Sequence, residues 1–108
     1  MPMENSALPL EKVKVNLETS KIPWHELQRF FAAGLAVAVS QELDLVEVAW
    51  QFSEDNKAQV EIWLANQQIA VVSDQQAQDW LAHDRSVWAV VVKPWILVQV
   101  VTSIEIVI

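Results

Sequence analysis

The sequence has 108 residues, of which 53% are apolar, and its 14 acidic residues against 7 basic residues give a net charge of −7. These values suit one folded domain with its own core, and they exclude both a disordered chain and two ordinary domains. The acidic excess is concentrated between Glu42 and Asp84, where the sequence holds a single cation, Lys57. The composition therefore excludes binding to nucleic acid and to anionic membranes, which need clustered Lys and Arg.

Cysteine is absent from the sequence, which excludes disulfides, thiolate nucleophiles and cysteine-containing metal sites and fits a reducing compartment. We therefore expect a cytoplasmic protein. Residues 1–9 lack the basic and apolar regions of a secretory signal, and we interpret them as a loose leader of a single domain that spans residues 1–108. The apolar stretch Ser86–Ile108 is long enough to cross a bilayer, but Lys93 and Pro94 interrupt it, so we expect no membrane span.

The first part of the chain predicts two helices and one strand. Leu10–Leu17 fits the spacing of a helix and the alternation of a strand, and we favour the helix. Pro23–Ala33 is a clearer helix, because proline suits a first turn and Gly34 follows where a helix would end. Leu35–Val39 is a continuous apolar run, which is typical of a buried strand.

The middle of the chain predicts a pair of helices. The first begins at Asp44, which has the spacing of a capping box with Glu47: the Asp carboxylate accepts from the Glu47 N–H, and the Glu side chain accepts from the Asp44 N–H. Its expected core face consists of Leu45, Val48, Ala49 and Phe52. The second helix begins after Asp55, ends near Asn66, and is expected to bury Val60, Trp63 and Leu64.

A short strand at Ile69–Val72 follows, and Ser73 with Gln76 then forms a second capping box. The helix that begins there is expected to bury Ala77, Trp80 and Leu81. Val87–Val92 and Trp95–Val101 are rich in β-branched residues and predict two strands joined by a turn at Lys93 and Pro94. The apolar tail at 100–108 offers one more strand at Ile104–Ile108.

The element order ααβααβαββ predicts an α+β fold. In this fold the helices pack on one side of a small, mostly antiparallel sheet within a single domain.

Three blocks of the sequence resemble a known family. They are IPWHELQRFF at 22–31, LDLVEVA at 43–49 and WAVVVKPWILVQ at 88–99, and they occur in the order seen in the small bacterial family called domain of unknown function 2288. The resemblance runs from about Leu10 to Gln99 and implies a free-standing bacterial domain. It assigns no catalytic or binding residue, and it does not extend to the tail after Gln99.

Neither a metal site nor a catalytic site is indicated by the sequence. His25 and His83 are far apart and show no paired spacing, so we expect no metal and no cofactor. The acidic pair Asp44 and Glu47 is explained as a helix cap, and a sequence with one glycine has no glycine-rich phosphate loop. A role other than catalysis is therefore favoured.

Tryptophan is unusually frequent, with six residues against no tyrosine. Trp24, Trp63 and Trp80 each fall on the apolar stripe of a predicted helix and are expected in the core. Trp50 lies off the stripe of its helix and is expected at the surface.

Alternation along the last long strand places Lys93, Trp95, Leu97 and Gln99 on one face, with Ile96, Val98 and Val100 on the other. The first face combines a cation, an aromatic ring and an amide, which are groups that converge in small binding pockets. A strand that is packed on one side and wet on the other explains the same pattern, and the sequence favours this simpler explanation.

Two functions remain open at this point. The first is a non-enzymatic protein-interaction module that forms a homo-oligomer, with Ile104, Ile106 and Ile108 on one face of a tail strand at the interface. The alternative is a small-ligand-binding protein or enzyme that uses Lys93, Trp95 and Gln99, together with carboxylates from Glu26 or Glu47.

Overall fold

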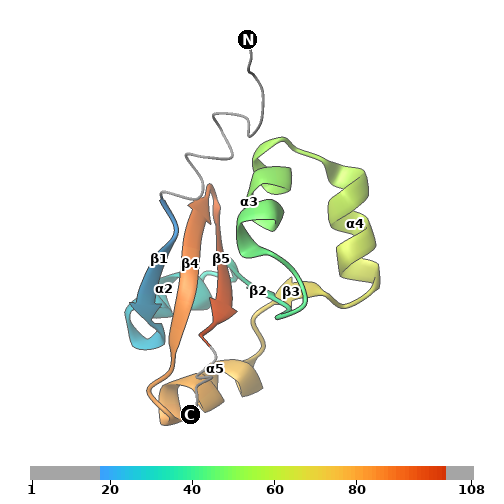
Figure 1. Cartoon of the computed structure of the whole chain (residues 1–108). Helices are drawn as coiled ribbons and strands as arrows, with labels where there is room; N and C mark the ends of the chain where they lie inside the picture. Colours follow the sequence, from blue (N-terminus) through green and yellow to red (C-terminus); the bar gives the residue numbers. More distant parts are fainter. Residues whose placement is uncertain (1–17, 102–108) are drawn as a thin grey trace, which may run out of the picture.

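The computed structural model describes residues 18–101. Figure 1 shows the elements of this part of the chain, which in order are β1 (Ser20–Pro23), the 3-10 helix η2 (Trp24–Leu27), α2 (Gln28–Ala32), β2 (Ala36–Val39), α3 (Leu45–Ser53), α4 (Lys57–Ala65), β3 (Ile69–Val71), α5 (Asp74–Ala82), β4 (Ser86–Val92) and β5 (Trp95–Val100). The leader at 1–9, the predicted helix at Leu10–Leu17 and the predicted tail strand at Ile104–Ile108 lie outside the described residues.

The five strands form one open sheet in the order β1-β4-β5-β2-β3. Neighbouring strands are antiparallel except for β2 and β5, which run parallel. β5 is the middle strand, and its residues Ile96, Leu97 and Val98 are fully buried or nearly so. The predicted single α+β domain with a mostly antiparallel sheet is confirmed, and the predicted element order differs from the observed one in lacking β1.

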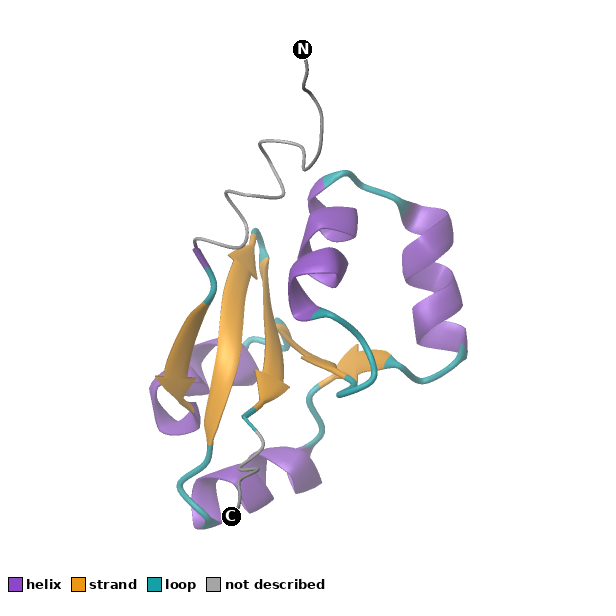
Figure 2. Cartoon of the chain, in the orientation of Figure 1, coloured by secondary structure: helices purple, strands orange, loops and turns teal. Residues whose placement is uncertain are grey.

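Helices cover both faces of the sheet, whereas the sequence predicted helices on one side (Figure 2). On the face that we call the α4 face, α3 and α4 pack on the strands through Leu45, Val48, Ala49, Trp63, Val37, Val39, Val90 and Leu97. On the opposite face, which we call the α5 face, η2 and α5 pack through Trp24, Leu27, Ala77, Trp80, Ala36, Val87, Ala89, Ile96 and Val98. Both faces are covered because β2 and β5 are apolar on both sides, and each apolar side must be removed from water.

The start of the described chain differs from the prediction. Pro23 ends strand β1, which pairs antiparallel with β4, and the helical backbone begins one residue later at Trp24. The predicted helix end is confirmed, because Gly34 follows α2 with a φ of 75°. Glycine reaches this left-handed conformation without a steric penalty.

The two predicted capping boxes have different outcomes. Ser73 and Gln76 form the complete reciprocal box at the start of α5. Asp44 does cap α3, but its carboxylate accepts from the N–H of Val46 at 3.0 Å rather than from that of Glu47, so the predicted bond is wrong. The Glu47 carboxylate accepts a 2.7 Å bond from Gln51 Nε2 one turn further along α3.

Most of the predicted core is confirmed, including Trp24, Trp63 and Trp80. Two expected core residues, Leu64 of α4 and Leu81 of α5, are instead about half exposed. In each case the neighbouring tryptophan faces the sheet, and a side chain one position further along the helix is turned by about 100° away from it. Trp50 is partly buried rather than fully exposed.

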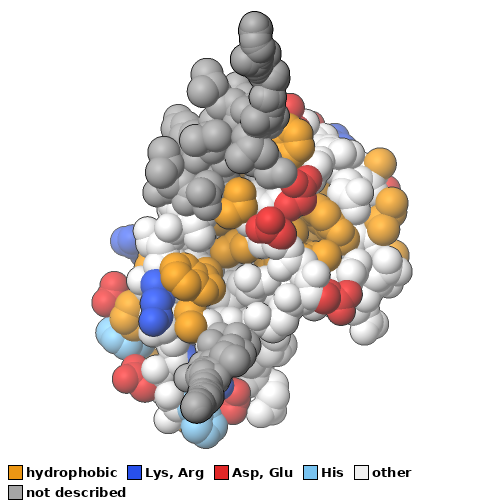
Figure 3. Space-filling view, viewed as in Figure 1, with side chains coloured by type: hydrophobic (Ala, Val, Ile, Leu, Met, Phe, Trp, Pro, Cys, Tyr) orange, Lys and Arg blue, Asp and Glu red, His pale blue; other side chains and the backbone are white. Residues whose placement is uncertain are grey.

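The hairpin of β4 and β5 turns at Lys93 and Pro94, as predicted, and pairs Val92 with Trp95 at its closed end. Within residues 18–101, every helix is too short or too polar to cross a membrane. Figure 3 shows acidic side chains spread over one face of the molecule, with no gathering of Lys and Arg there.

Candidate functional site

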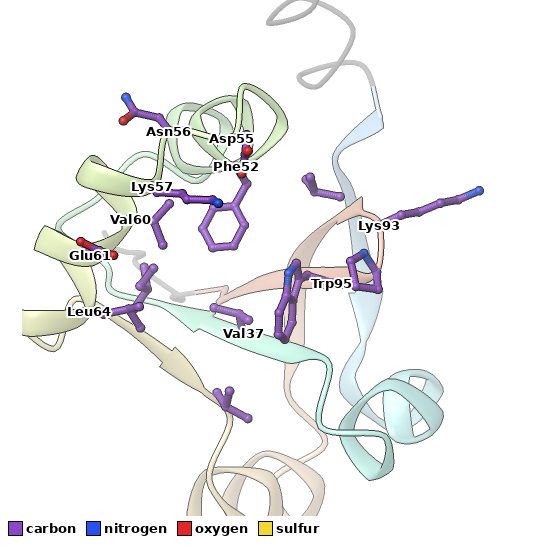
Figure 4. Close-up of a pocket in the computed structure, with 14 residues that line it drawn as sticks. Val37, Phe52, Asp55, Asn56, Lys57, Val60, Glu61, Leu64, Lys93 and Trp95 are labelled. Atoms are coloured by element: carbon purple, nitrogen blue, oxygen red, sulfur yellow. The ribbon is translucent and has the colours of Figure 1, made fainter.

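A groove of about 600 Å³ lies on the α4 face. Figure 4 shows Val60 and Leu64 of α4 on one side, Trp95 of β5 on the other, and Phe52 and Val37 between them. Its full lining is Val37, Phe52, Asp55, Asn56, Lys57, Val60, Glu61, Leu64, Ile69, Val71, Val92, Lys93, Pro94 and Trp95. The volume falls within the range of small-molecule pockets, roughly 300–1,000 Å³.

The groove exists because α3 and α4 cover the sheet unequally. α3 packs directly on β4 and β5, whereas α4 contacts α3 and the short edge strand β3. α4 buries Trp63 but leaves Val60 and Leu64 incompletely covered. The apolar wall of α4 therefore faces the hairpin end of β4 and β5 across a gap that no side chain of the described residues fills.

Four charged residues lie along the groove, and they balance one another in sign: Lys57, Lys93, Asp55 and Glu61. Lys57 extends from the start of α4 toward Phe52, whereas Lys93 points away from the groove (Figure 4). No carboxylate within residues 18–101 lies at ion-pair distance from the Lys57 ammonium. One cation is thus held beside an apolar lining without a salt bridge to this part of the chain.

The three strand residues expected to form a binding face do not all lie at the groove. Lys93 and Trp95 both line the groove, although the Lys93 side chain points away from it. Gln99 lies on the same face of β5 but does not line the groove. Its amide Nε2 donates to the carbonyl oxygens of Ser40 and Leu43, each at 2.8 Å. Gln99 therefore fastens the loop between β2 and α3 to the middle strand.

The two candidate carboxylates do not reach the groove. Glu26 is exposed on η2, which packs on the α5 face, and it does not line the groove. Glu47 is outside the groove lining and accepts from Gln51. The predicted combination of Lys93, Trp95 and Gln99 with either carboxylate is therefore not assembled.

The histidines lie apart, and residues 18–101 contain no group of three His, Cys, Asp or Glu side chains arranged for a metal ion. His83 caps the end of α5, where its Nδ1 is 3.2 Å from a carboxylate oxygen of Asp79. Protonated histidine is favourable at this end of a helix, because it faces the negative end of the helix dipole.

The groove wall on α4 and the contribution of β3 were not predicted. The sequence does contain a signal for an exposed apolar wall on this helix, which is the run Ile62, Trp63 and Leu64. Three successive apolar residues on one helix cannot all face the same core. Lys57 gives a second signal as the single cation of an otherwise acidic region.

The model of a family described as a protein of unknown function (DUF2288) matches residues 11–100. The chain belongs to this family. The solution structure of PA1075 from Pseudomonas aeruginosa, determined by NMR, is similar to the DUF2288 chain at 37% sequence identity, with 92% of each chain covered and a TM-score of 0.74. No curated protein matches the sequence.

The family match includes every residue of the groove, from Val37 to Trp95. It ends at residue 100, so Ile104, Ile106 and Ile108 lie beyond it. The groove therefore belongs to the part of the chain that defines the DUF2288 domain, and the tail does not.

Proposed function

We propose that this DUF2288 domain is a small-ligand-binding protein of the bacterial cytoplasm, whose groove on the α4 face takes an amphipathic molecule with an apolar body and a single negative charge. The proposal keeps Trp95 from the sequence-based alternative, assigns the charge contact to Lys57 instead of Lys93, and replaces Gln99 and Glu26 with residues of α3 and α4. The cytoplasmic location is supported by the absence of cysteine, which fits a reducing compartment.

The observation that carries the proposal is the position of Lys57 beside the apolar lining. Phe52, Val60 and Trp95 offer an apolar surface to a ligand, and burying that surface contributes roughly 25 cal/mol for each Å². The Lys57 ammonium offers a partner for one carboxylate at the same place. Because Asp55 and Glu61 also line the groove, a singly charged head group is favoured over a doubly charged one.

The test uses decanoate as the probe and the indole N–H signals of the six tryptophans as reporters in NMR spectra. Decanoate is expected to shift the Trp95 signal, because Trp95 lines the groove, and to leave those of Trp24 and Trp80 unchanged on the other side of the sheet. Equal shifts of all six signals, or none at millimolar decanoate, would refute the site.

The head-group assignment has its own comparison. Replacing Lys57→Met is expected to weaken decanoate binding about two- to fivefold, the range for an exposed ion pair of up to about 1 kcal/mol. Binding of decanol, which carries no charge, should be unaffected. Lys21→Met on β1, at the far edge of the sheet, is the matched control. If decanoate binding is the same in all three proteins, the charge of the ligand has been assigned wrongly.

A second candidate function is the homo-oligomeric interaction module expected from the sequence. It is supported by a specific feature of β3, which lies at one end of the sheet order and has an unpaired edge within the described residues. Strand edges of this kind pair with other chains unless they are protected. Sedimentation equilibrium of the full chain at tens of micromolar tests this role: a dimer mass supports it, and a monomer mass rejects it.

A further inference from the structure

The backbone of β3 shows which of its groups are free. Ala70 of β3 is opposite Ala38 of β2, and bonds from the Val72 N–H to the Ala36 carbonyl and from the Ser40 N–H to the Gln68 carbonyl flank this pair. Antiparallel pairs alternate between bonded and non-bonded positions. The N–H and C=O groups of Ile69 and Val71 therefore point away from β2, toward the open side of the sheet.

The two edges of the sheet differ in protection. β1 forms the other edge and carries Lys21 and Pro23, residue types that block the addition of a further strand. The segment from Asn66 to Ser73, which contains β3, has no charged residue and no proline, although the chain as a whole has a net charge of −7. Of the two sheet edges formed by residues 18–101, the β3 edge is therefore the less protected against another strand.

Apolar side chains accompany this open backbone. Val71 of β3 is 53% exposed, and Leu64 of the neighbouring helix α4 is 49% exposed. Ala70 is also exposed, and its methyl group leaves room for a second backbone to approach. A partner strand would thus gain both backbone hydrogen bonds and contact with apolar side chains.

We propose that two copies of this chain pair through β3 in antiparallel orientation, with Ala70 on the two-fold axis. This inference rests on the second candidate function above and names the surface that would serve it. Leu64, Ile69 and Val71 also line the groove, so the paired edge borders the proposed ligand site. In this register Ile69 of one copy faces Val71 of the other, and each such pair exchanges two backbone hydrogen bonds. Both outward-pointing residues of β3 are then satisfied, and the two sheets join into one.

The absence of cysteine from the native sequence allows a direct test of the register. The two Ala70 residues would form a non-bonded antiparallel pair, whose Cα atoms are about 4.5 Å apart and thus near the short end of the distances that a disulfide spans. Under mild oxidation at tens of micromolar, Ala70→Cys is expected to migrate mostly as a disulfide-linked dimer on a non-reducing gel. Val91→Cys, exposed on β4, and Lys21→Cys, on the β1 edge, are the matched controls and should remain mostly monomeric.

A second variant tests the interface without cross-linking. Val71→Lys places a charge on the open edge, and because Val71 is half exposed the fold should be retained, as far-UV circular dichroism will show. Like charges brought close across the axis should weaken dimerisation about tenfold or more in sedimentation equilibrium.

The outcomes separate the two claims. A native chain that sediments as a monomer at tens of micromolar overturns both self-association and this pairing. A native dimer in which Ala70→Cys cross-links no faster than the controls, or in which Val71→Lys has no effect, overturns the β3 pairing alone and leaves self-association standing.

Discussion

The side chain of Gln99 holds together two segments that are distant in the sequence. Its amide donates to the carbonyls of Ser40 and Leu43, which belong to the loop after β2, while Gln99 itself lies on β5. In the sequence, Gln99 shares a strand face with Lys93 and Trp95, and this pattern is compatible with ligand binding. The sequence does not show that the two carbonyls lie near Gln99, because they approach it only when β2 pairs with β5 in the folded sheet.

Replacing Gln99→Met keeps the length of the side chain and removes both hydrogen bonds. We expect the free energy of unfolding to fall by about 1–3 kcal/mol, because two carbonyls at a partly buried position lose their donor. Urea denaturation measures the change. Gln75→Met, on the exposed side of α5, is the control and should stay within about 0.5 kcal/mol of the native protein. Equal stability of the two variants would contradict the fastening role of Gln99.

At the scale of the elements, helix starts depend on single polar side chains. Ser73 and Gln76 satisfy each other's backbone N–H groups at the start of α5, whereas Asp44 caps α3 through Val46. The same spacing therefore has two outcomes. In α3 the side chain of Glu47 accepts from Gln51 along the helix instead of completing a capping box with Asp44. The spacing of Asp44 and Glu47 in the sequence could not predict this choice of partner.

Loss of either cap should destabilise the protein. Ser73→Ala and Asp44→Ala are each expected to cost about 0.5–2 kcal/mol of unfolding free energy, because each leaves a helix N–H without its acceptor. Thermal unfolding monitored by circular dichroism measures this cost. Gln78→Ala lies in the interior of α5 and is the control, with an expected change of less than about 0.5 kcal/mol. If both cap variants unfold at the native temperature, these side chains do not stabilise the helix starts.

The sequence predicted the regular elements well where apolar periodicity is long. It identified the helices α3, α4 and α5 and the strands β2, β3, β4 and β5, because each has an apolar stripe or run of its own. β1 was missed because Ser20–Pro23 is short and contains a lysine and a proline, which are uncommon in strands.

The groove could be predicted in part. Lys93 and Trp95 are two residues apart in the sequence and were found from alternation along one strand. Phe52 and Val60 were expected in the core, because their spacing shows which side of a helix is apolar but not how closely that side approaches the sheet. Their distance from Trp95 depends on how α3 packs on β4 and β5 and how α4 packs on α3 and β3, which no local pattern encodes.

At the scale of the whole molecule, two surfaces compete for the role of interface. The tail residues Ile104, Ile106 and Ile108 were proposed from the sequence and lie outside the described residues, whereas β3 is proposed from the structure. Ending the chain after Thr102 removes the first surface and leaves the second. Because β3 is intact in the shortened chain, we expect it to remain a dimer in sedimentation equilibrium.

The opposite result would also be informative. A shortened chain that is folded and monomeric, together with a Val71→Lys variant that still dimerises, would assign the interface to the three isoleucines. Together, the two variants therefore locate the contact between copies.

The position of β5 also determines when the protein can fold during its synthesis. β5 supplies Leu97 to the core on the α4 face and Ile96 and Val98 to the core on the α5 face, and it joins β4 to β2. Without it the sheet separates into two strand pairs, β1 with β4 and β2 with β3, and two-stranded pairs are at best marginally stable alone. Ribosomes deliver the N-terminal part of a chain first, so both cores stay incomplete until this late strand has left the exit tunnel. Until that moment the nascent chain exposes its apolar segments to proteases and chaperones.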